Sequence, residues 1–199
     1  MLSLNFVAKL AAPALLAALV VLPACTINAD KNKEGAGRVD IKTPMGNLHV
    51  NEQPDIRDVG LALYPGAKPA EKTNSEDKKS ANVNLSFPGF DLKVVAAEFH
   101  SDDPNDKVVA FYNKELQHYG KIVECHGKWT GGNVEANPGK NDDLSKPVSC
   151  HDSGGDESIE LKVGTEGNQH IVAVKPDGLG TKFALVYVRI HTGKDDDTI

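Results

Sequence analysis

Apolar residues recur at every second position through much of this chain, and turns containing Gly or Pro separate the alternating runs. Alternation of this kind is typical of β-strands with one buried face, and short turns join such strands in antiparallel order. Two hairpins are expected, at 38–51 and 81–100, and further strands at 59–64, 121–125, 158–163, 170–175 and 183–190. The run at 94–97 is apolar at consecutive positions, which favours a central place in the sheet.

One segment follows a helical period instead. Apolar side chains are spaced three or four residues apart between residues 103 and 119, at Val108, Phe111, Tyr112, Leu116 and Tyr119. The acidic residues before Pro104 are suited to capping the helix, and Gly120 is suited to ending it. The sequence therefore predicts an α+β fold, in which one helix, at about 104–119, packs on a face of an antiparallel, mostly meander sheet.

The first 24 residues have the composition of an export signal. Lys9 precedes an apolar run of about 13 residues, Leu10 to Leu22, interrupted by Pro13. A membrane-spanning helix needs about 20 apolar residues, so this run matches the apolar region of a signal peptide better than a transmembrane segment.

The residues that end this segment, Leu22-Pro23-Ala24-Cys25, resemble the lipobox of bacterial lipoproteins. The resemblance implies cleavage before Cys25 and attachment of lipid to that cysteine. By analogy with the same class, Thr26 in place of Asp implies sorting to the outer membrane, with the protein facing the periplasm. The hairpin at 38–51 and the turn Tyr64-Pro65-Gly66-Ala67 are similar to patterns in uncharacterised bacterial envelope lipoproteins, to which no activity is attached.

The expected domain organisation follows from these signals. Residues 1–24 are a signal peptide, 25–37 a polar, flexible tether, 38–191 a single α+β domain, and 192–199 an acidic disordered tail. The first hairpin, 38–50, is a candidate for a small satellite of that domain. The stretch from Lys68 to Ser80 is charged and is expected as an exposed loop.

Composition narrows the class of partner. The chain has 199 residues, of which 40% are apolar and 25% charged, and its formal net charge is -6. Nucleic acids and anionic lipid headgroups attract basic surfaces, so this charge argues against both as electrostatic partners.

Two cysteines remain after Cys25, and each is followed by a histidine: Cys125-His126 and Cys150-His151. A disulfide between Cys125 and Cys150 is the preferred interpretation for an exported protein. Two Cys and two His also match the ligand set of a tetrahedral zinc site, which is the alternative. Adjacent residues of a strand point to opposite faces, which disfavours zinc.

No other pattern predicts a metal, a cofactor or catalysis. Residues 149–153 read Ser-Cys-His-Asp-Ser, but catalytic triads form in space and not in a row. The acidic groups at 102–106, 152–157 and 195–197 suit helix capping or solvation, and the glycines at 127–132 lack the spacing of a phosphate-binding loop. Trp129, the only tryptophan, lies in this glycine-containing loop, at the edge of the core or on a contact surface.

The sequence therefore predicts a non-catalytic envelope lipoprotein that works as a binding or accessory module, with the membrane and an envelope protein as partners. Its alternative is a carrier that holds a hydrophobic ligand between the helix and a curved sheet, which would need an apolar cavity of about 300 Å³ or more.

Overall fold

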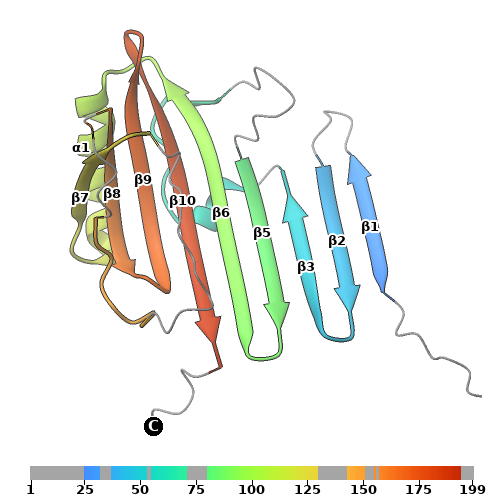
Figure 1. The fold of residues 1–199 in the computed structure, drawn as a ribbon. Coiled ribbons are helices and arrows are strands. Elements are labelled where there is room, and N and C mark those ends of the chain that lie inside the picture. Colours follow the sequence, from blue (N-terminus) through green and yellow to red (C-terminus); the bar gives the residue numbers. More distant parts are fainter. Residues whose placement is uncertain are drawn as a thin grey trace, which may run out of the picture.

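The computed structural model describes residues 25–31, 37–52, 55–70, 80–129, 143–150, 155 and 157–193. These residues form a ten-stranded antiparallel sheet with one main helix (Figure 1), so the predicted fold class is confirmed. The strands are β1 (Thr26–Lys31), β2 (Gly37–Thr43), β3 (Gly46–Asn51), β4 (Lys68–Pro69), β5 (Ser80–Phe87), β6 (Phe90–Ser101), β7 (Val123–Gly127), β8 (Ser158–Thr165), β9 (Asn168–Asp177) and β10 (Gly180–Thr192).

The strand order is β1-β2-β3-β5-β6-β10-β9-β8-β7, with the short β4 paired to β6. Most neighbours in the sheet are also neighbours in the chain, as in a meander. One exception is the pair β3 and β5, since β4 lies between them in the chain, and another is β10, which lies between β6 and β9 and pairs with β6 over twelve residues. The strand β6 is therefore central in the sheet, as the consecutive apolar residues at 94–97 predict.

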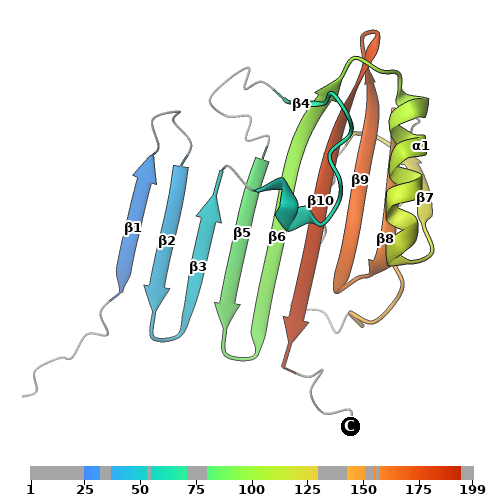
Figure 2. The ribbon, with the colours of Figure 1, turned by 180° about the vertical axis from the view of Figure 1, so that it is seen from behind.

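The helical elements are the 3₁₀ helix η1 (Ile56–Val59), the helix α1 (Asn105–Leu116) and its 3₁₀ continuation η2 (Gln117–Tyr119). Figure 2 shows α1 packed on one face of the sheet, where it contacts β8, β9 and β10. Val108, Tyr112 and Leu116 are completely buried there, which confirms the predicted apolar stripe. Phe111 is only half-buried and Tyr119 is exposed, so the stripe is narrower than its periodicity indicates.

The start of α1 differs from the prediction. Pro104 occupies the capping position, and no side chain caps the helix. The carboxylate of Asp103 instead accepts hydrogen bonds from the Tyr64 hydroxyl, at 3.0 Å, and from Lys107, at 2.7 Å. These bonds tie the helix start to the segment before β4.

Three expectations about the first half of the chain are wrong. Residues 26–31, expected in a flexible tether, form β1, because an edge strand needs only backbone partners and β2 supplies them. The hairpin of β2 and β3 is not a satellite, since β3 pairs with β5 and so continues the main sheet. The segment expected as a strand at 59–64 contains the end of η1 and then extended chain leading to the Tyr64–Ala67 turn.

The C-terminal boundary also moves, because β10 continues to Thr192. The acidic residues 195–197 and the greater part of the predicted loop at 68–80 lie outside the described residues.

Candidate functional site

Cys25, the predicted lipidation residue, is exposed and unpaired, and it directly precedes β1. Thr26, the next residue, already pairs with Lys42 of β2. The rest of the lipobox motif, residues 22–24, lies outside the described residues, as does the predicted signal peptide. None of the described helices is long and apolar enough to cross a membrane.

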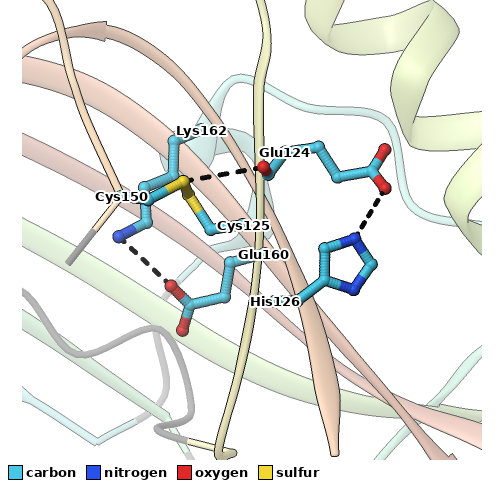
Figure 3. Close-up of a disulfide and its surroundings, with 6 residues drawn as sticks. All are labelled: Glu124, Cys125, His126, Cys150, Glu160 and Lys162. Carbon is cyan, nitrogen blue, oxygen red and sulfur yellow. Dashed lines mark hydrogen bonds and ion pairs between the residues drawn. A yellow bond between two sulfur atoms is a disulfide. The ribbon is translucent and has the colours of Figure 1, made fainter. Parts of the chain in front are cut away.

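Cys125 and Cys150 form the predicted disulfide, with their Cα atoms 5.5 Å apart. The bond joins β7 to the segment 143–150, which is also tied to the β8–β9 turn by backbone hydrogen bonds such as that from Gly167 N to Leu144 O, at 2.9 Å. Figure 3 shows the disulfide beside Glu160 and Lys162, which form an ion pair at 3.2 Å.

The zinc alternative is wrong, because both sulfur atoms are bonded to each other. His126 points away from the disulfide and contacts Glu124 at 3.1 Å (Figure 3), as expected for neighbouring residues of a strand. His151 lies outside the described residues, together with most of the Ser149–Ser153 motif. Among the described side chains, no group of three or more His, Cys, Asp or Glu is arranged to hold a metal ion.

The space between helix and sheet, where the alternative function requires a ligand, holds a packed core. The Tyr112 ring lies 5.6 Å from that of Phe183, and the Phe183 ring lies 5.6 Å from that of Phe99. The Tyr112 hydroxyl accepts a hydrogen bond from the Tyr64 backbone N–H, at 3.1 Å. Completely buried aliphatic side chains fill the remainder of this layer: Val59, Val95, Leu161, Val163, Val172, Val174 and Leu185.

A histidine that the sequence analysis did not single out lies at the edge of this core. The His170 ring lies between the rings of Tyr119 and Tyr187, tilted to each, with centroid distances of 4.1 Å and 4.8 Å. Burial lowers the pKa of His170, and a hydrogen bond to the backbone of Val59 opposes this shift only in part. The ring is therefore held neutral near physiological pH and acts as a core group; its place inside an apolar run of β9 was the available signal.

This environment predicts a pH-dependent stability. When the chain unfolds, His170 regains an ordinary pKa of about 6.5, so protonation favours the unfolded state as the pH falls below that value. While the folded ring stays neutral, protonation of His170 in the unfolded chain should lower the free energy of unfolding by up to about 1.4 kcal/mol for each unit that the pH falls. Urea titrations between pH 7.5 and the acid limit of folding measure this slope. His170→Gln should flatten it and the exposed control His126→Gln should not; an equal slope in all three proteins would contradict the assignment.

A surface hollow of about 560 Å³ opens at the end of the sheet where β10 finishes. The ends of β6 and β10, the β8–β9 turn and residues 144–145 surround it, and its lining mixes charged, polar and apolar groups, among them Asp91, Leu144, Asn168 and Arg189. It lies away from the helix–sheet core, so it is not the apolar cavity that a carrier needs.

The strands β1, β2, β3 and β5 have one polar and one apolar face, and residues 91–94 at the start of β6 continue both faces. Because residues paired across an antiparallel ladder point to the same side, the register defines both faces. On one side of the sheet, two rows of apolar residues run across these strands, and we call these two rows the apolar face. The first row is Ile27, Ile41, Leu48, Leu85 and Leu92, and the second is Ala29, Val39, Val50, Val83 and Val94. On the other side, the row between them is polar: Asn28, Asp40, His49, Asn84 and Lys93.

The apolar face is on the side opposite α1. The helix-facing residue Val95 of β6 shares its side with Asn82 of β5, whereas Val94 shares its side with Val83. Figures 1 and 2 show β1, β2 and β3 as a single layer, with no described helix over either side. The apolar face continues into the buried cluster of Ile171, Val186 and Val188, against which Leu92 and Val94 pack.

No family model, curated protein or solved structure matches this chain. The fold places the chain in a class, the α+β proteins with an open antiparallel sheet. One face of this sheet packs on the helix and the other is apolar, and the role of the protein is inferred from this geometry.

Proposed function

We propose that this chain is a lipid-anchored protein of the bacterial envelope that works as a non-catalytic binding module. The observation that carries the proposal is Cys25, which ends a lipobox-like motif and is exposed at the start of the folded sheet. A thiol in that place is accessible for acylation.

Physical chemistry accounts for a stable anchor. Each buried CH₂ contributes about 0.8 kcal/mol, so one acyl chain binds reversibly, whereas the three chains implied by the lipoprotein resemblance hold a protein permanently. Because β1 begins at the residue after Cys25, no flexible spacer separates the lipid from the sheet. The domain would therefore be held close to the headgroups.

The surface near the anchor supports this arrangement. Met45, in the β2–β3 turn, is 72% exposed, and Phe87, beside the β5–β6 turn, is 45% exposed. Both turns lie at the end of the sheet where β1 begins (Figure 1). Apolar tips at this end suit contact with the headgroup region.

The binding role is supported by the apolar face, whose larger side chains are half-buried except for the exposed Ile27, since contiguous accessible apolar surface marks interaction sites. A hydrophobic ligand remains the second candidate, but the packed core leaves the space under the helix filled. The apolar face is thus the better place for an apolar partner, and its open form suits a protein surface.

Replacing Cys25 tests the anchor. We expect the full-length Cys25→Ser chain to lose acyl-chain incorporation and to remain unprocessed or appear in the soluble fraction, whereas the control Thr26→Ala should be lipidated and membrane-bound like the wild type. Metabolic labelling with a fatty acid, intact mass spectrometry and membrane fractionation give the readouts. An unmodified Cys25 in the mature wild-type protein would end the proposal.

Pull-down of the lipidated protein from its own membrane tests the binding role. Proteins or lipids recovered with the wild type, and lost when Leu48 is replaced by Asp, identify what the apolar face binds. Recovery that is unchanged by Leu48→Asp would show that this face is not the binding surface.

A further inference from the structure

We infer that the apolar face is an interface between two copies of this chain, which pack face to face as a two-layer β-sandwich. The inference does not need lipidation, so it stands apart from the proposed anchor. It starts from the separation of polar and apolar side chains in β1, β2, β3 and β5, which the first residues of β6 continue.

Every described residue in the two apolar rows is aliphatic, and none is ionisable. The polar side of the same strands carries charged and amide groups, including the Asp40–His49 pair. A sheet that is polar on one side and apolar on the other is the ordinary half of a sandwich, in which two inner faces pack about 10 Å apart. The described helices cover the opposite side of the sheet, where α1 packs on β8, β9 and β10 and η1 contacts β6 and β10.

The size of the face fits a dimer. Five strands about 4.8 Å apart, with about six residues of about 3.4 Å along each, give this side of the sheet a footprint of roughly 480 Å² per copy, of which the two apolar rows fill about two thirds and the strand ends form the rim. Two such footprints bury about 1,000 Å², which is near the lower bound for a specific protein interface. The rows border the cluster of Ile171, Val186 and Val188, which is already buried within one copy and adds nothing to this area.

Other occupants fit less well. A small apolar ligand binds in a concave pocket, and the rows lie across an open sheet. A face that rests flat on a bilayer is held there by basic groups at its rim, whereas this chain has a net charge of -6 and its two apolar rows hold no basic residue. A second copy brings an identical uncharged face, and two-fold pairing is the commonest form of association.

The position of Cys25 selects the orientation of the pair. If the two-fold axis runs along the strands, both copies place the start of β1 at the same end of the sandwich. Both lipid anchors then enter one membrane. This orientation rests on the proposed function, but the face-to-face contact does not.

Photo-crosslinking of the full-length chain in cells tests the interface. The photoreactive residue p-benzoylphenylalanine replaces Leu48 or Val83 on the apolar face, and Asn47 or Asn84, their chain neighbours on the polar face, as matched controls. Two differently tagged copies are expressed together, so that a crosslinked homodimer is recovered through both tags. We expect a homodimer from positions 48 and 83, and its loss at positions 47 and 84.

A second variant keeps the test decisive. Leu48→Asp should abolish the homodimer formed through position 83, and Asn47→Asp should leave it intact; unreduced thiol labelling of Cys125 and Cys150 verifies folding of each variant. Crosslinks only to lipid or to another protein, absence of any crosslink, or a homodimer that survives Leu48→Asp would overturn the inference. Membrane fractionation of the same cells reports separately on the anchor, so failure of the dimer and failure of the anchor are distinguished.

Discussion

Leu116→Ala should lower the free energy of unfolding by about 2–5 kcal/mol, the range found when a large core side chain is truncated. Leu116 is completely buried at the end of α1, in the layer that packs on the sheet. Truncation removes its apolar contacts and leaves a cavity that the rigid sheet beneath cannot close. Urea denaturation followed by circular dichroism measures the loss.

The matched control is Lys114→Ala, two residues away and exposed on the same helix. Surface changes of this kind cost less than about 0.5 kcal/mol. Lys107 is a poorer control, because its ammonium group is paired with Asp103 at the start of the helix. Equal losses from Leu116→Ala and Lys114→Ala would show that α1 does not pack as described.

Removing the disulfide should have an effect of similar size. Cys125 and Cys150 are 25 positions apart in the sequence. For a loop of that length, the chain-entropy treatment gives a stabilisation of about 3.5 kcal/mol, through restriction of the unfolded state. The double variant Cys125→Ser/Cys150→Ser should lose about this amount, and it leaves no unpaired thiol to confuse the result.

The exposed control Ser149→Ala, next to Cys150, should change stability by less than about 0.5 kcal/mol. A thiol reagent applied to the denatured but unreduced wild type should label neither Cys125 nor Cys150, and should label both after reduction. Labelling of both without reductant would show that the bond does not form in the protein as isolated.

Local patterns in the sequence predict much of this fold. The hairpins at 38–51 and 81–100 and the last three strands follow from alternation and from Gly- and Pro-containing turns, and α1 follows from its period. The disulfide follows from an even pair of cysteines in a chain that resembles an exported protein. In each case the signal lies in the segment itself or in its composition.

The features that the sequence did not predict depend on partners distant in the chain. In the segment 26–31 only Ile27 and Ala29 are apolar, an alternation too short to predict a strand, and the segment becomes β1 because β2 offers a free edge. The apolar face could not be predicted either, because alternation within one strand does not say whether its apolar side chains lie on the same side of the sheet as those of the next strand. The register of the four ladders that join these strands decides that, and it aligns Ile41, Leu48 and Leu85 in one row.

The sequence also left His170 unnoticed, since a histidine in an apolar strand has no motif. Its two tyrosine neighbours come from η2 and from β10, which the chain brings together only in the folded state.

The place of β10 has a consequence for how the protein reaches its native state. Phe90–Ser101 must wait for Gly180–Thr192, the last strand of the chain, before its long ladder can form. The N-terminal hairpins and α1 are synthesised earlier, but the layer under the helix is incomplete until that final strand is inserted. Pairing across so many residues slows folding, because a long loop must close before the contacts compensate for its entropy. The rate-limiting event in folding is therefore expected at the carboxyl end of the chain, and a truncation there would leave β6 and β9 as two unjoined edges.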